Sequence, residues 1–228
     1  MSADAGDLKA ARLNTGWSQE EAAARLGVSQ PYYSQMERGY RPLPARLVSR
    51  AVRKLHLAPT ALPMPPLATQ FVPVAPDELA SALARLGYEA FGHLSKRAKA
   101  YNPAYLVVGT LVHADLEVRI VEVLPWILST FHDLDWLWLI AQCRLLNVQN
   151  RLGYLVVLAR QLGNSTADVN LKNALFHLEE SRLVVEGTLC RESMPTAERD
   201  WVRRHRSSEA SHWSILTTLT ADQLSYAA

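Results

Sequence analysis

The sequence predicts an all-α protein in which a small N-terminal helical domain precedes a larger helical domain. Apolar residues recur near a 3.6-residue period along most of the chain, alternating strand patterns are scarce, and a proline-rich segment divides the chain. We expect residues 1–58 to form the first domain, 59–76 a linker and 77–228 the second domain. A length of 228 residues suits this organisation, because it allows one or two domains with a sizeable core.

Within the first domain, two short helices are predicted on either side of a glycine. Ser18 and Glu21 stand three residues apart and form a capping box, in which each side chain satisfies a backbone N–H at the other residue. Gly27 supplies the left-handed residue that ends a helix, and Ser29 can cap the next helix. So short a turn between two helices indicates a helix-turn-helix.

The second helix of this pair has two different sides. At 100° per residue, Tyr33, Met36 and Glu37 share one side. The opposite side is rich in amide and guanidinium donors and carries Gln30, Pro31, Ser34, Gln35 and Arg38. Glutamine pairs bidentately with adenine in the major groove, and arginine pairs with guanine. The polar side is therefore compatible with DNA readout, and also with a solvated face on a small helical hairpin.

Residues 7–57 as a whole resemble the Cro/repressor-like (XRE) helix-turn-helix family. The matching residues are Leu8, Arg12, Gly16 to Glu21, Ala23, Leu26 to Ser29 and Ser34 to Gly39. The sequence departs from the family pattern at Ala22, where the family usually has Leu, and at Tyr33, where it usually has Ile or Val. We expect the larger Tyr33 to fill the space that the smaller Ala22 leaves. The resemblance implies a lambda-repressor-like domain of four to five helices that binds double-stranded DNA.

The resemblance also implies roles for individual side chains. Gln19 would hold a DNA phosphate, while Gln30 and Gln35 would reach base edges. The expected DNA-binding residues are Gln19, Ser29, Gln30, Tyr32, Ser34, Gln35, Arg38, Arg41 and Arg46. Arg12 and Glu37 match a family ion pair that ties the first helix to the end of the recognition helix. The simpler alternative for that pair is a surface contact worth under about 1 kcal/mol.

The basic residues are unevenly distributed, although the net charge of the whole chain is only +2. Residues 1–58 hold nine Lys or Arg and five Asp or Glu. Residues 59–228 hold fifteen Lys or Arg and seventeen Asp or Glu. Between Arg38 and Lys54 there are six basic residues and no acidic one. A basic stripe beside a helix-turn-helix is typical of phosphate contacts, and the missing acids weaken the alternative of an ordinary solvated face.

The segment 59–76 holds six of the twelve prolines, and proline favours extended backbone over helix. It also holds several apolar residues, so we expect part of it to lie along the second domain. From residue 77 onward we expect about seven helices that pack as one all-α domain. The predicted helical runs start at Asp77 and at Asn102-Pro103, and cover residues 136–140, 148–162, 168–185, 196–206 and 208–219.

Three features of the second domain leave alternatives open. Residues 106–108 and 118–123 are β-branched enough to keep strands possible. Residues 150–154 resemble tetratricopeptide-type helix pairs, but the 34-residue period of such repeats is not evident. Asp133 or Asp135 is expected to cap the helix that follows.

Five tryptophans are expected in the core, namely Trp126, Trp136, Trp138, Trp201 and Trp213.

No cofactor, metal or catalytic site is expected. His113, His132-Asp133 and Asp168 or Asp200 loosely resemble a metal-dependent HD phosphohydrolase, but capping or surface roles explain these residues more simply. Cys143 and Cys190 form no C-x-x-C motif and are expected to be small core residues. We also expect no signal peptide, no transmembrane helix and a cytoplasmic location.

These observations predict a sequence-specific DNA-binding transcriptional regulator, most simply a repressor that binds an inverted repeat as a homodimer. The first domain would bind the operator, and residues 77–228 would dimerise, sense a small-molecule effector or bind a protein partner. The alternative is an antitoxin, whose second domain neutralises a toxin while the first domain represses its own operon. A third alternative is an enzyme with a DNA-targeting domain.

Overall fold

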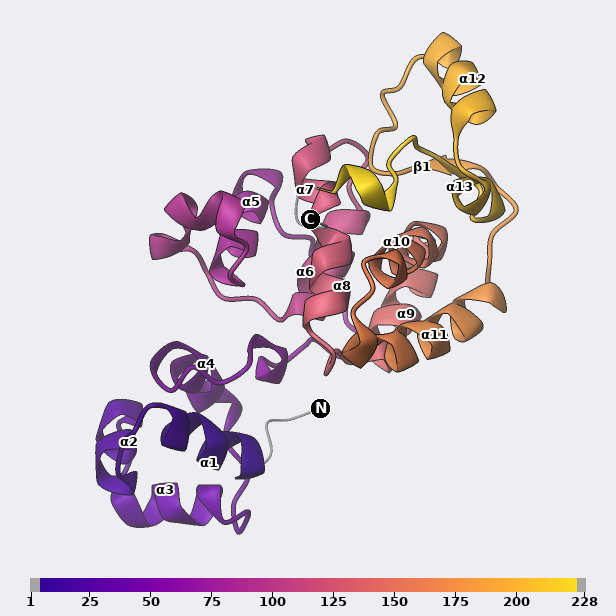
Figure 1. Cartoon of the computed structure of the whole chain (residues 1–228). Coiled ribbons are helices and arrows are strands. Elements are labelled where there is room, and N and C mark those ends of the chain that lie inside the picture. The colour runs from indigo at the N-terminus through magenta and orange to yellow at the C-terminus, as the bar shows by residue number, and fades with distance from the viewer. Residues whose placement is uncertain (1–4, 225–228) are drawn as a thin grey trace. The chain divides into compact units, whose positions relative to one another are not determined.

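The structure is a computed structural model that describes residues 5–224, without the side chains of residue 5 and residues 95–97. Over this range it contains thirteen α-helices and one two-stranded sheet, so the all-α prediction is confirmed. The chain forms two compact units (Figure 1). We call the first unit, residues 1–65 with 100–102, the head, and the other residues the second unit.

The head is a bundle of four short helices followed by one turn of 3-10 helix (Figure 1). These elements are α1 (Ala5–Asn14), α2 (Gln19–Leu26), α3 (Gln30–Glu37), α4 (Ala45–Lys54) and η1 (Pro59–Ala61). All four α-helices contribute to one apolar core, which includes Leu8, Leu26, Tyr33, Met36 and Ala51. None of these helices exceeds ten residues, and helices this short owe their stability mainly to packing.

The second unit surrounds a central apolar helix, α10, which packs against α8, α9 and α11 (Figure 1). The elements before α10 are α5 (Pro76–Arg85), η2 (Glu89–Arg97), α6 (Pro103–Leu111), α7 (Val118–Glu122), α8 (Leu124–Thr130) and α9 (Trp136–Leu145). Those from α10 onward are α10 (Gln149–Gln161), α11 (Ser165–Glu179), β1 (Gly187–Thr188), α12 (Thr196–His205), α13 (Ser208–His212), β2 (Ile215–Leu216) and η3 (Ala221–Gln223). No helix in the described range is both long and apolar enough to cross a membrane.

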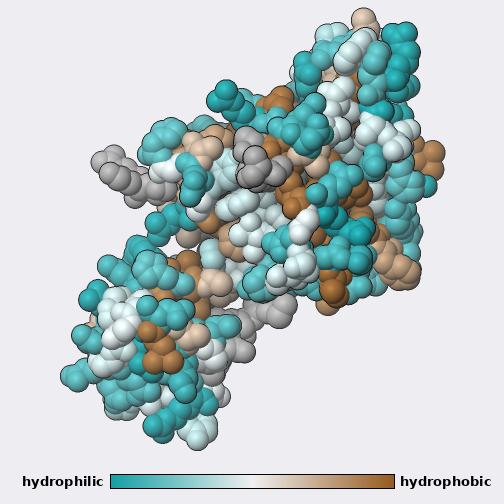
Figure 2. All heavy atoms as spheres, viewed as in Figure 1, coloured by the Kyte–Doolittle hydropathy of each residue, from teal (hydrophilic) through white to brown (hydrophobic). Residues whose placement is uncertain are grey.

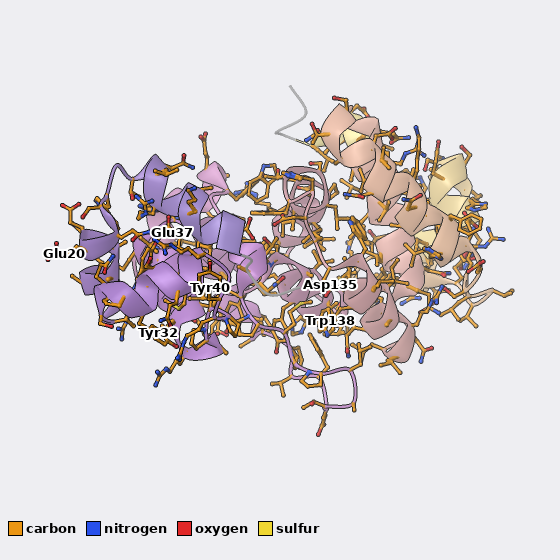
Figure 3. All side chains as sticks on the ribbon, turned by 90° about the horizontal axis from the view of Figure 1, so that it is seen from below. Glu20, Tyr32, Glu37, Tyr40, Asp135 and Trp138 are labelled. Atoms are coloured by element: carbon orange, nitrogen blue, oxygen red, sulfur yellow. The ribbon has the colours of Figure 1, made fainter. Side chains whose placement is uncertain are left out.

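The start of α9 follows the capping prediction. Asp135 is the N-cap residue, and its side chain accepts a hydrogen bond of 3.0 Å from the backbone N–H of Trp138 (Figure 3). Asn164 caps α11 in the same way by accepting from the backbone N–H of Thr166. Because of this cap, α11 begins at Ser165, three residues before the predicted start.

Several predictions about the second unit need correction. It contains nine α-helices in the described range rather than about seven, because short helices such as α7 and α13 add to the longer ones. Both segments that were compatible with strands are helical, in α6 and α7. The helix predicted over residues 208–219 ends at His212, and the helix predicted over 168–185 ends at Glu179.

The chain after α13 forms a strand that the sequence analysis did not predict. β2 pairs in parallel with β1, with Gly187 opposite Ile215 and Thr188 opposite Leu216. Just before β2, the ring of Trp213 lies against Gly153 of α10, where an added Cβ atom would come within 2.3 Å of the indole. Gly153 therefore allows close approach of this aromatic ring, which accounts for a glycine in the middle of a buried helix.

The proline-rich segment 59–76 is divided between the two units. Its first part forms η1 in the head, where the side-chain amide of Asn102 donates to the backbone oxygens of Thr60 and Leu62, at 2.8 Å each. Its second part belongs to the second unit, where Val74 is buried and its backbone oxygen lies 2.8 Å from Nε2 of His113. The segment therefore packs in both units and does not run as an extended tether.

The buried aromatic and cysteine residues largely follow expectation. Trp138 and Trp213 are buried, whereas Trp126 and Trp136 are half-buried. Trp201 is 50% exposed, so its assignment to the core was wrong. Cys143 and Cys190 are free and buried, as expected for small core residues. Burial raises the pKa of both thiols, in the case of Cys190 to about 11.

Candidate nucleic-acid interface

Local signals in the sequence set the geometry of the helix pair α2 and α3. The side chain of Ser18 accepts from the backbone N–H of Glu21 at 3.1 Å, and the Glu21 carboxylate accepts from the N–H of Ser18 at 2.8 Å. This capping box lowers the pKa of Glu21 through its hydrogen bonds with Ser18. Gly27 then adopts φ +70°, which reverses the chain, and Ser29 caps α3.

The two sides of α3 are as the helical period predicts. Tyr33, Met36 and Glu37 are its buried residues. Tyr33 and Ala22 both have no exposed area and belong to the same apolar core. The Tyr33 hydroxyl is buried without a hydrogen-bond partner among the described residues, and burial together with the nearby Glu37 raises the pKa of Tyr33 to about 12.

An ion pair joins α1 to the end of α3, as the resemblance implied. Nη2 of Arg12 lies 2.7 Å from Oε1 of Glu37, and Nε of Arg12 also donates to the carboxylate. The side chains are 12% and 3% exposed, so this is not a surface contact. The hydrogen bond to Glu37 raises the pKa of Arg12, and Nη1 of Arg12 donates to the backbone oxygen of Trp17 at 2.8 Å.

The same carboxylate begins a line of hydrogen bonds that reaches the polar side of α3. Nε2 of Gln19 donates to Oε2 of Glu37 at 3.2 Å, and Nε2 of Gln30 donates to Oε1 of Gln19 at 3.0 Å. We call Arg12, Glu37, Gln19 and Gln30 the amide relay. Figure 3 shows Glu37 among the head helices, whereas Glu20 and Tyr32 lie at the periphery of the head.

The amide relay has a fixed polarity. An ionised carboxylate only accepts hydrogen bonds, so Gln19 must turn its NH₂ group toward Glu37 and its oxygen toward Gln30. Gln30 must in turn donate to Gln19, which leaves one N–H and the amide oxygen of Gln30 for another partner. One donor and one acceptor are what a bidentate contact with adenine requires.

The other expected DNA-binding residues lie on α3, at its two ends and, in the case of Arg46, on α4. Gln35, Arg38, Arg41 and Arg46 are exposed, while Tyr32 and Ser34 are half-buried. The guanidinium of Arg41 lies 5.4 Å from the centre of the Tyr32 ring, within the range of a cation–π contact. Ser29 uses its hydroxyl oxygen to cap α3 by accepting from the N–H of Tyr32. Arg41 therefore lies beside α3, whereas Arg46 lies on α4.

One member of the basic stripe has a structural role that the sequence analysis missed. Nη1 of Arg50 donates to the backbone oxygen of Leu26 at 2.5 Å and so satisfies the C-terminal end of α2. A Cβ atom at Gly27 would come within 2.6 Å of the same guanidinium nitrogen. Apart from Gly27, the sequence shows no local group that could cap the C-terminal end of α2. This absence does not identify which of the six basic residues supplies the cap.

The residues considered for a metal site are not grouped to bind one. Within the described range, no three His, Cys, Asp or Glu side chains gather in a way that could hold a metal ion. Asp168 instead pairs with Lys172 and Arg160, whose hydrogen bonds lower its pKa, and Asp200 pairs with Arg203.

Comparison with known protein families agrees with this geometry. Residues 8–62 match the family model described as Helix-turn-helix. The head is therefore an XRE-type helix-turn-helix domain, as its sequence indicated. This match supports a role in DNA binding and transcription regulation, and it covers the head alone. Neither the curated proteins nor the solved structures yielded a match to the chain.

Proposed function

We propose that the protein is a sequence-specific repressor that binds an inverted-repeat operator as a homodimer. The amide relay is the observation that carries the proposal, because it presents Gln30 on an exposed helix face with its amide already oriented. Gln35 lies on the same exposed face and would read a second base edge. Arg38, Arg41 and Arg46 would contact phosphates, which position the head without reading sequence.

The base-reading and phosphate roles can be separated by experiment. An operator would first be selected from a random DNA pool with the full-length protein. We expect Gln35→Ala to weaken operator binding by roughly 1–3 kcal/mol and to relax the choice at one base position. Arg46→Ala should weaken binding to all sequences alike and lower the slope of log affinity against log salt by about 1. An equal loss on every sequence for Gln35→Ala would remove the base-reading assignment.

The dimer is proposed to form through the second unit. Figure 2 shows apolar side chains on the visible face of this unit, and some of its large apolar residues are strongly exposed. They are Leu137, Leu145, Val169, Phe176, Val184 and Val185. A two-fold dimer is the commonest oligomer, and it would place two heads on half-sites roughly 34 Å apart. A DNA-binding regulator of this kind would act in the cytoplasm, and we propose no enzymatic activity for it.

Sedimentation of the full-length protein at micromolar concentration tests the dimer. We expect a dimer that Phe176→Asp weakens, while Leu13→Asp, a change at an exposed apolar residue of the head, leaves it intact. Loss of the dimer in the Leu13→Asp variant alone would assign the interface to the head. The exposed apolar residues of the second unit equally favour a different protein as partner, which is the antitoxin alternative. A protein that stays monomeric until a toxin is added would support that alternative.

A further inference from the structure

The second unit contains a cavity of about 300 Å³ that neither DNA binding nor dimerisation explains. Its walls come from α7, the turn around residue 190, α12, and the chain between β2 and η3, all of which can be followed in Figure 1. The lining includes the buried apolar side chains of Val121, Met194, Val202 and Leu216. The size is at the lower end of the range for small-molecule sites, roughly 300–1,000 Å³.

One wall of the cavity is held in a conformation that costs energy. Cys190 lines the cavity with φ +56°, a left-handed backbone angle that is unfavourable for residues other than glycine. Arg151 holds this turn, since its guanidinium donates to the backbone oxygens of Thr188 at 2.8 Å and Leu111 at 2.6 Å. It also pairs with Glu192 at 2.9 Å. The wall is thus fixed before any ligand arrives, which reduces the entropy lost on binding.

The rim of the cavity differs chemically from its floor. Trp201 lines it and is 50% exposed, although a tryptophan usually buries most of its surface. His205 stacks on one face of this indole, with ring centres 4.3 Å apart, and does not line the cavity. The charged lining residues are Glu122, Glu198 and Arg191, and the last two form an ion pair of 2.8 Å. The formal charges of these three side chains sum to −1, and they line the same cavity as the indole of Trp201.

We propose that this cavity binds an amphipathic organic cation with one aromatic ring or a body of similar size. The apolar floor would take the body of the ligand, since burial of apolar surface is favourable. The cationic group would lie between the indole of Trp201 and the carboxylates of the rim, where cation–π and charge attraction add. A dry cavity of about 150 Å³ holds benzene, so 300 Å³ leaves room for a ring and a short charged chain.

An anionic ligand fits the rim less well. Such a ligand would have to displace Glu198 from Arg191 and would then lie in a cavity lined by two carboxylates, those of Glu198 and Glu122. The proposal concerns the second unit alone and does not depend on DNA binding by the head, so each can fail without the other.

The test compares three probes that share a phenyl ring and a two-carbon spacer: 2-phenylethylammonium, 2-phenylethanol and 3-phenylpropionate. Dissociation constants for the full-length protein would be measured by ligand-observed nuclear magnetic resonance. We expect the ammonium probe to bind about tenfold more tightly than the alcohol, and the carboxylate probe to bind least. Equal affinities, tightest binding of the carboxylate, or no saturable binding of the ammonium probe in the millimolar range would overturn the proposal.

Site variants locate the binding. Trp201→Ala should weaken binding of the ammonium probe about tenfold, and Trp201→Phe should restore part of the loss by returning an aromatic face. Glu198→Gln should reduce the preference for the ammonium probe over the alcohol. Val72→Ala is the matched control, because it truncates another exposed apolar side chain of the same unit outside the cavity. Circular dichroism on heating verifies folding, and unchanged binding in folded Trp201→Ala and Glu198→Gln variants would overturn the site assignment.

Discussion

Replacing Glu37 by Gln should destabilise the head by roughly 2–3 kcal/mol. The change preserves the shape of a side chain that is only 3% exposed, but it removes the charge that Arg12 faces. Removing one partner of a buried ion pair costs about 3–5 kcal/mol. We place this case lower because Arg12 is 12% exposed and keeps its hydrogen bond to the backbone oxygen of Trp17. A glutamine also has a single acceptor oxygen for the donors of Arg12 and Gln19.

Amide hydrogen exchange read by mass spectrometry suits this prediction, because it resolves the head from the second unit in the full-length protein. Opening free energies of peptides from α1 and α3 should fall by roughly 2–3 kcal/mol, while peptides from α10 stay unchanged as an internal reference. Glu20→Gln is the matched control, since Glu20 is an exposed carboxylate of the same head and its loss should cost less than about 0.5 kcal/mol.

A double-mutant cycle decides whether the pair itself is responsible. Arg12→Met alone leaves an uncompensated carboxylate, so Arg12→Met with Glu37→Gln should be less destabilised than the sum of the two single changes. If Glu37→Gln changes the head by no more than the Glu20→Gln control does, the pair contributes like a surface contact and the reasoning from its burial is refuted.

Two further predictions concern buried aromatic residues. The pKa of Tyr33 is raised to about 12, so its contribution to stability is complete below the unfolded value near 10 and is lost as the pH rises through 12. Urea unfolding followed by circular dichroism should show this loss, of up to roughly 2–3 kcal/mol, in the parent protein, whereas in Tyr33→Phe it should be absent. At neutral pH, Tyr33→Phe should be nearly neutral because the hydroxyl has no hydrogen-bond partner among the described residues. Gly153→Ala should destabilise the second unit by about 1–3 kcal/mol, since the new methyl group overlaps the ring of Trp213; a melting temperature equal to that of the parent would contradict the close approach.

The head could be predicted from sequence because its signals are local. The capping box of Ser18 and Glu21, the turn at Gly27 and the cap at Ser29 each act within a few residues. The buried side of α3 follows from its helical period alone. The long-range pair of Arg12 and Glu37 came instead from resemblance to a family, since nothing in the spacing of two residues 25 apart predicts a contact.

The parts that could not be predicted depend on contacts between distant segments. Ile215–Leu216 forms a strand only because Gly187–Thr188 lies beside it, and the run that contains it is equally compatible with a helix. Trp201 lies among charged residues of α12, and the helix buries its apolar neighbour Val202 while it leaves the indole half-exposed. The sequence indicated the same phosphate-contacting role for all six basic residues between Arg38 and Lys54. In the structure Arg50 instead caps the C-terminal end of α2.

The amide relay has a consequence for attempts to transplant the recognition helix. Gln30 owes its orientation to Gln19 and to a carboxylate held by Arg12, and two of these three supports lie outside α3. Grafting the exposed residues of α3 onto another protein would transfer the DNA-facing side chains without the side chains that orient Gln30. If Gln30 reads a base as proposed, such a chimera should keep general DNA affinity and lose discrimination at that base. Its specificity should return when positions 12 and 19 are transplanted with the helix.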